Sequence, residues 1–538
     1  MKAIKITGIG LVLILLWRCG NTAESDYTIF RYNDASGITS LDPAFASSLS
    51  NIWAVQQLYN GLVQLDSALQ VKPCLARRWE LSEDGLKYIF YLRRDVVFHP
   101  CPCFSGKRFL IADDVVFTFQ RLKNTGSGSW ITNYLAQDES GMPWVKAWND
   151  SVVEFRLKSP FVQFVQVLAT PYAMIVPKEA VEYYGQDFGF HPVGTGPFLF
   201  RKWLLNEKLV LNKNPEYFEW EGDYRLPYLD GVAVTFLKDP HVAMLDFIRG
   251  KLDFLSGMEQ AYQQELVSIN GEVKEKYKND IQLFRAPYLN TEYIGFYLGD
   301  SDSAMQGIGH LGVRKALQLA LNKTIITQYV KKGVGIPAEN GFIPPSLRVY
   351  NSDYKSIKSA TINYWLKYSA YNSPQEVPSF TLYADPLYAE IYTQVINQWK
   401  KAGFRVQLEI LDRPTLKSQI AKGQLACFRG SWIGDFADAL NYYSVFYSRN
   451  WSPAGPNYTH FSSAAYDRIY EAAMNTLNDS LRNVHYQQMD SIIQHELPVI
   501  PLYYDEVIRF VRKEITGLGI NGMNNLDLKR VKKMHRLN

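Results

Sequence analysis

The sequence has almost no excess of charge of either sign. Its 538 residues include 57 Lys and Arg against 53 Asp and Glu, a formal net charge of +4. The first 18 residues contribute Lys2, Lys5 and Arg18 and no acid, so the net charge of the remainder falls to +1. A protein that binds nucleic acid usually carries a strong basic surplus. The near-neutral body therefore argues against nucleic acid as a partner.

Motifs of common hydrolases and nucleotide-binding proteins are missing. The sequence has no H-E-x-x-H and no G-x-S-x-G, and its eight His residues are scattered. Two stretches, 307–312 and 517–522, match G-x-G-x-x-G. The first follows a polar loop, and the second lies too near the C-terminal end to open a βαβ unit. We therefore expect no enzyme, no cofactor and no metal, with a hydrolase of an unrecognised family as the rival class.

Long apolar runs are also missing, apart from one at the start. The run 9–17 follows two lysines and is too short to span a bilayer, which is typical of a secretory signal. Cys19 follows it as in a lipoprotein cleavage site, although Arg18 stands where that pattern has a small residue. We predict a signal peptide over 1–18, lipid attachment at Cys19, a tether over 19–26, and a periplasmic or cell-surface location. Plain secretion is the alternative.

Few cysteines remain beyond the predicted lipid site. Cys74, Cys101, Cys103 and Cys427 form an even number in an exported chain, which permits three disulfide pairings. The Cys-Pro-Cys spacing suggests metal or redox chemistry, but one such pair is weak evidence for either. We expect a disulfide or inert thiols. Pro102 makes a bond between its two neighbours sterically awkward.

Apolar and aromatic residues are abundant in the sequence. It is 47% hydrophobic, 14% aromatic and 20% charged, which is typical of a globular protein. The length is too great for one core, so two or more domains are expected. Apolar residues at helical spacing predict helices over 50–60 and 389–401. The second helix lies between predicted strands 380–383 and 404–410, an arrangement of an α/β lobe.

The stretch 429–438 carries the candidate binding chemistry. It places Asp435 three residues after Trp432, and glycines such as Gly434 remove side chains that would keep another backbone at a distance. If 425–433 form a strand, period two sends Arg429 to one face, and Asp435 follows if the strand persists. A cation and an anion would then face one space. The alternative is a strand ending in a turn, with Trp432 in the core and Asp435 as a helix cap.

This stretch resembles the ligand segment of the bacterial extracellular solute-binding proteins of family 5, the peptide-binding subunits of ABC importers. In that family the Asp three residues after the Trp holds the α-ammonium of a bound peptide, and Asp435 matches it. In the oligopeptide-binding branch an Arg three residues before the Trp meets the peptide carboxylate, and Arg429 stands there. Further segments resemble the family in the same order: 111–119, 192–198, 249–253, 313–323 and 341–345.

The resemblance extends over essentially everything after residue 27, and it implies an α/β fold of the periplasmic-binding-protein type II. Two hinged lobes are expected, with lobe I formed by 27–70, 192–285 and 498–538, an extra domain over 71–191, and lobe II over 286–497. The implied function is capture of peptides between the lobes, as a monomer, and delivery to a membrane permease. Relatives also bind nickel chelates, oligosaccharides or haem, and these ligands stay as alternatives.

Overall fold

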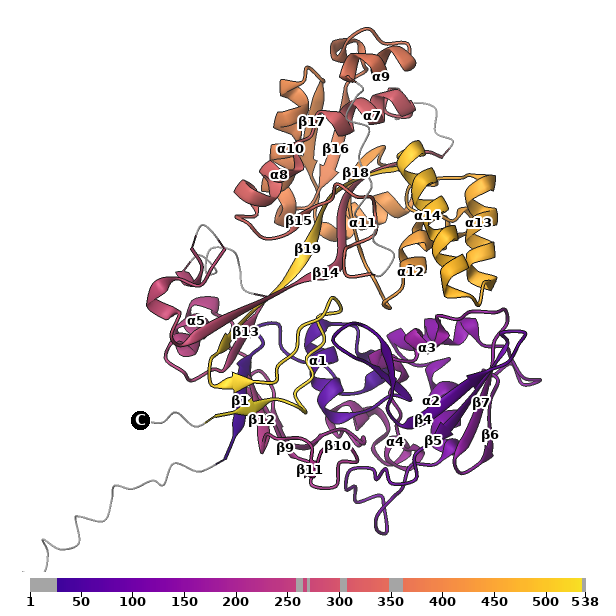
Figure 1. Cartoon of the computed structure of the whole chain (residues 1–538), viewed down its shortest axis with the longest axis vertical. Helices are drawn as coiled ribbons and strands as arrows, with labels where there is room; N and C mark the ends of the chain where they lie inside the picture. The colour runs from indigo at the N-terminus through magenta and orange to yellow at the C-terminus, as the bar shows by residue number, and fades with distance from the viewer. Residues whose placement is uncertain (1–26, 258–264, 269–270, 300–306, 348–360, 535–538) are drawn as a thin grey trace, which may run out of the picture.

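The computed structural model describes residues 27–257, 265–268, 271–299, 307–347 and 361–534. The predicted signal peptide, Cys19 and the tether lie outside this part of the chain. Figure 1 shows two bodies, one above the other, that are joined by the long strands β14 and β19. The fold is mixed α/β, as predicted. No helix in the described residues is long and apolar enough to cross a membrane.

One mixed sheet runs through both bodies. Its central pair is β14 (Ile281–Phe296) and β19 (Val499–Arg512), which are antiparallel from Ile281↔Arg512 to Gly295↔Val499. The register shifts between Pro287 and Thr291 and again after Glu292, so β14 is irregular near its middle. The predicted lobe boundary at residue 286 falls inside β14, because this strand continues from one body into the other.

The remaining strands of this sheet follow the order β17-β16-β18-β14-β19-β13-β1-β12-β9-β8, with β15 also paired to β19. Their bounds are β17 Val406–Ile410, β16 Phe380–Ala384, β18 Cys427–Ile433, β13 Phe254–Ser256, β1 Ile29–Asn33, β12 Gly231–Thr235, β9 Lys208–Lys213, β8 Phe198–Leu204 and β15 Ile336–Pro337.

The lower body holds the N-terminal strand and the helix that follows it. Helix α1 (Leu49–Leu58) confirms the predicted helix near 50–60. Ser48 caps it by accepting a hydrogen bond from the Asn51 backbone N–H. Trp53 is buried in the helix and packs edge-on against Phe254 of β13. Helix α5 (Pro240–Ile248) packs beside β13 in the same body.

A separate sheet of four strands lies within the segment predicted as the extra domain. Its order is β4-β5-β7-β6, antiparallel throughout. Helix α2 packs on this sheet, and Phe119 of α2 meets Phe155 of β7 edge-on. The bounds are β4 Ala76–Leu81, β5 Lys87–Leu92, β6 Val145–Asn149, β7 Val152–Arg156, α2 Ala112–Leu122, α3 Phe164–Val167 and α4 Lys178–Tyr184.

The upper body contains the predicted strand, helix, strand unit. Strands β16 and β17 are parallel, and α10 (Ala389–Lys401) connects them. The helix is fixed by Trp399, which is fully buried and donates through Nε1 to the Leu317 carbonyl, 2.9 Å away. The other helices are α7 Leu311–Leu319, α8 Lys323–Ile325, α9 Ile362–Tyr368, α11 Arg413–Ala421, α12 Ala439–Tyr443, α13 Ala464–Asn475 and α14 Asp479–Glu496.

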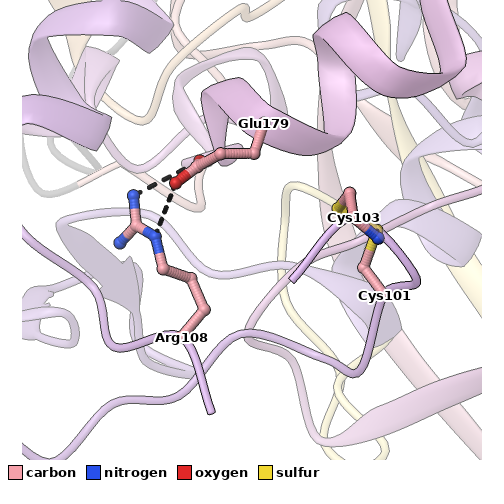
Figure 2. Close-up of a disulfide and its surroundings, with 4 residues drawn as sticks. All are labelled: Cys101, Cys103, Arg108 and Glu179. Atoms are coloured by element: carbon pink, nitrogen blue, oxygen red, sulfur yellow. Dashed lines mark hydrogen bonds and ion pairs between the residues drawn. A yellow bond between two sulfur atoms is a disulfide. The ribbon is translucent and has the colours of Figure 1, made fainter. Parts of the chain in front are cut away.

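The observed disulfide is the pairing that Pro102 was expected to disfavour. Cys101 and Cys103 are bonded to each other, with their Cα atoms 5.1 Å apart (Figure 2). That separation lies within the range that a disulfide spans, so Pro102 does not prevent the bond. Cys74 and Cys427 are buried free thiols.

Candidate functional site

Asp435 lies where β18 ends and the chain turns towards α12. The strand predicted over 425–433 is confirmed as β18, and the Gly434 N–H then donates to the Leu289 carbonyl, 2.9 Å away. The residue that caps α12 is Asp438, whose Oδ1 accepts from the Leu440 N–H at 2.8 Å. Asp435 therefore does not cap the next helix, and its side chain is left for another use.

The Asp435 carboxylate has no cation beside it. Asn441 donates from Nδ2 to Asp435 Oδ2 at 3.4 Å, and the Asp435 backbone N–H donates to Asn441 Oδ1. Among the described residues no lysine, arginine or histidine forms an ion pair with Asp435. The side chain is open to solvent, yet the surrounding protein is dense enough that burial raises its pKa above the usual aspartate range. The carboxylate is thus exposed to solvent but surrounded by protein on several sides.

Two tyrosines, from the segment predicted as the extra domain, lie near enough to feel the charge of this carboxylate. Burial, with a smaller contribution from the charge of Asp435, raises the pKa of Tyr134 to about 12 and also raises the pKa of Tyr172. Trp130 lies beside both rings, with centroid distances of 6.2 and 6.3 Å. The sequence did not single out these residues, and its only signal was the presence of aromatic residues in a loop-rich segment.

The extra domain and the upper body are in contact around Asp435. Phe161 stacks on Tyr134 at 4.5 Å and meets Phe436 edge-on at 6.1 Å. Gln163 Nε2 donates to the Tyr486 hydroxyl at 2.9 Å. A cavity of about 330 Å³ lies beside these contacts, lined by both bodies through segments 68–71, 162–166, 437–439 and 479–486. The two bodies are therefore in contact at this site.

One edge of β18 is open next to Asp435. Strand β14 pairs with β18 along its whole length, whereas β16 pairs with it only at Cys427 and Phe428. From 429 to 433 no other strand of the described chain takes the second edge. The backbone N–H and C=O groups on that edge can therefore pair with an added extended chain.

Trp432 and the glycines have local packing partners. Trp432 is half-buried, and its Nε1 donates to Asn441 Oδ1 at 2.9 Å, so Asn441 holds both Trp432 and Asp435. A Cβ at Gly434 would lie 3.2 Å from the ring of Tyr442. This glycine therefore makes room for a tyrosine ring.

Arg429 is turned towards the inside of the protein. Its Nε and Nη2 donate to the two carboxylate oxygens of Glu292 at 2.7 and 2.9 Å. The guanidinium also lies 3.7 Å from the centre of the Tyr388 ring and 3.6 Å from Asp385 Oδ2. Burial raises the pKa of Glu292 even with Arg429 beside it. The structure thus pairs Arg429 with an internal carboxylate, and its predicted contact with a ligand carboxylate stays a prediction.

No metal centre is evident in the part of the chain that the structure describes. Within it, no group of three or more His, Cys, Asp or Glu side chains is arranged to hold a metal ion.

Comparisons with known proteins point to one family. A family model described as bacterial extracellular solute-binding proteins, family 5 middle, matches residues 70–453. The chain is 27% identical over 527 residues to the probable deoxycholate-binding periplasmic protein YgiS of Escherichia coli strain K12, covering 93% of this chain and 92% of that protein. It is 25% identical over 488 residues to the dipeptide-binding protein of the same strain, covering 86% of each. The structure of HbpA2 from Haemophilus parasuis matches with a TM-score of 0.83 at 23% identity, covering 94% of this chain and all of that one.

Proposed function

Because this chain belongs to the bacterial extracellular solute-binding proteins of family 5, and is thus the non-catalytic binding protein of an ABC importer, we propose that it carries small peptides with a free amino terminus. The observation that supports this ligand class is the Asp435 carboxylate. It lacks a cation partner among the described residues, and its charge acts on the aromatic residues Tyr134 and Tyr172.

The charge of Asp435 favours an ammonium group as its partner. A carboxylate surrounded by protein costs free energy unless an opposite charge or several hydrogen bonds compensate it. Asn441 supplies only one long hydrogen bond. A peptide α-ammonium has donors for both carboxylate oxygens, and the faces of Tyr134 and Tyr172 attract the same cation.

The open edge of β18 favours an extended peptide backbone. A peptide that adds to residues 429–433 would form main-chain hydrogen bonds that do not depend on its side chains. The Trp432 ring would flank this added strand, and Gly434 would sit at the turn next to the amino terminus. Arg429 stays the predicted partner of the peptide carboxylate. It would have to share its guanidinium between that group and Glu292.

Closure completes the proposed mechanism. Lobe I (27–70, 192–285 and 498–538) with its extra domain (71–191) would close on lobe II (286–497) about the long strands β14 and β19. The contact between Gln163 and Tyr486 forms across this closure. The closed form then delivers the peptide to the permease. We further propose that Cys19 bears a lipid that keeps the protein at the membrane, which the mass of the mature N-terminal peptide would test.

The ligand that accompanies the purified protein tests the proposal. The protein is exported by its own signal, purified without denaturant, and unfolded in acid so that bound molecules are released for mass spectrometry. Peptides with free amino termini are expected, and Asp435→Asn protein should release far fewer. A bile acid such as deoxycholate, a sugar or haem, retained equally by both proteins, would contradict the proposal. These ligands bring no ammonium to Asp435.

A further inference from the structure

The Cys101–Cys103 disulfide lies in a loop that other contacts already hold. Arg108 pairs with Glu179 of α4 at 2.8 Å and with Asp114 of α2 at 2.7 Å, and Figure 2 shows the first of these pairs beside the disulfide. The Phe98 N–H also donates to the Arg108 carbonyl across the base of the loop. The loop is therefore anchored at its base without the sulfur bond.

The bond itself adds little constraint to the chain. A disulfide stabilises a fold mainly by closing a loop in the unfolded chain, and the effect grows with the number of residues enclosed. Here a single residue lies between the two cysteines, which is close to the smallest loop that can be closed. Stabilisation is thus a weak explanation for this pair.

The two sulfurs differ in exposure and in hydrogen bonding, and this difference favours attack by a thiol at one of them. Cys101 is 9% exposed and buried, whereas Cys103 is only partly buried and lies between exposed residues 102 and 105. The Cys103 backbone N–H donates to Cys101 Sγ at 3.1 Å. A hydrogen-bond donor at a sulfur stabilises its thiolate and makes it a better leaving group. Attack at Cys103 with departure of Cys101 is therefore the favoured path.

We propose that Cys101–Cys103 is a redox-active disulfide that exchanges with small thiols, with Cys103 as the sulfur that is attacked. The incoming thiol gives its proton to water, and its thiolate bonds to Cys103 Sγ. The bond to Cys101 breaks, and its electron pair leaves on Cys101 Sγ. The incoming sulfur is oxidised into a mixed disulfide and Cys101 is reduced to a thiolate.

A second thiol completes the exchange. Its thiolate attacks the sulfur of the first thiol in the mixed disulfide, so that Cys103 leaves as a thiolate and the two small thiols form their own disulfide. The protein is then a dithiol, and the reverse steps restore its disulfide. This chemistry is independent of the proposed peptide site, so either proposal can fail without the other.

The oxidised mature protein is incubated under native conditions with millimolar reduced glutathione, quenched in acid and alkylated, and its peptides are analysed by mass spectrometry. Glutathione is expected on Cys103 and the alkyl group on Cys101. Cys74 and Cys427, at 4% and 0% exposure, should stay unmodified and serve as internal controls. Reduction should lower the melting temperature by no more than about 3 °C, because so short a loop is closed.

A matched pair of variants tests which sulfur is attacked. The variants lack the disulfide, so they are given oxidised glutathione instead. Cys101→Ser should form a mixed disulfide at Cys103 with release of one reduced glutathione, and should keep it because no neighbouring protein thiol remains to expel it. Cys103→Ser should react at least about tenfold more slowly, because Cys101 is buried. A disulfide that opens only in denaturant would overturn the proposal. So would an adduct on Cys101, or equal rates for the two variants.

Discussion

Replacing Asp435 with asparagine should remove most of the affinity for peptides. The substitution keeps the size of the side chain and its contact with Asn441 but removes the negative charge. Two unit charges about 4 Å apart interact by about 4 kcal/mol at the effective dielectric near a protein surface. Truncating one partner of such a pair costs about 2 to 5 kcal/mol. We therefore expect Kd to rise between about 30-fold and several thousand-fold.

Calorimetric titration with a peptide and its N-acetyl derivative tests this prediction. Acetylation removes the ammonium, so it should weaken binding to the native protein as much as the substitution does. The two changes should not add when combined, since they remove the same interaction. Glu390→Gln, which removes an exposed carboxylate on α10, is the matched control and should bind normally.

The pH dependence gives a second readout of the same pair. Burial raises the pKa of Asp435, so its carboxylate is protonated at a higher pH than an ordinary aspartate. Affinity should therefore fall as the pH decreases, beginning above the usual aspartate range. Unchanged binding by Asp435→Asn, or equal affinity for the acetylated peptide, would refute the reasoning.

Three further predictions concern stability and closure. Burial raises the pKa of Asp490 to about 7, so the native state keeps a proton that the unfolded chain loses above about pH 4. The free energy of unfolding should therefore fall as the pH rises from about 4 to about 7. In urea unfolding at pH 8, Asp490→Asn should be more stable than the native protein by about 2 to 4 kcal/mol. Equal urea midpoints for the two proteins would contradict this prediction. Arg429→Met should lower the free energy of unfolding by about 3 to 5 kcal/mol, because it leaves Glu292 unpaired. Adding Glu292→Leu should restore much of this loss. Unchanged stability of Arg429→Met would count against a structural ion pair. Gln163→Ala should weaken peptide binding about 5- to 100-fold, because it removes the hydrogen bond to Tyr486 between the two bodies. X-ray scattering should then show a more open molecule. Unchanged affinity would show that this hydrogen bond does not stabilise the closed form.

The sequence predicted the regular segments well and the long central strands only in part. Helix 389–401 is observed with the same bounds, because its apolar spacing is regular and Gly403 follows it. The apolar segments 293–297 and 498–504 predict strands, and these segments overlap β14 and β19. Their other halves contain charged and polar residues such as Arg285 and Asn290, which interrupt the apolar alternation. These residues find partners only in the folded sheet, where Arg285 pairs with Glu506 at 2.8 Å.

Only some residues of the candidate site could be predicted from the sequence. The motif around Trp432 was enough to propose Asp435, whereas period two does not reach it because β18 ends at Ile433. Tyr134 and Tyr172 could not be proposed, because they lie about 300 and 260 residues earlier and come near Asp435 only in the folded chain. The sequence showed Arg429 as an available cation because its partner Glu292 lies on a neighbouring strand, 137 residues away. The sequence pattern therefore identifies a charged residue but leaves its partner unknown.

A crystal structure of the protein with a bound peptide tests the central claim most directly. The account predicts the peptide α-ammonium nitrogen within about 3 Å of an Asp435 carboxylate oxygen, with the peptide backbone along residues 429–433. A ligand seated elsewhere, with the Asp435 carboxylate in contact only with water and Asn441, would contradict it.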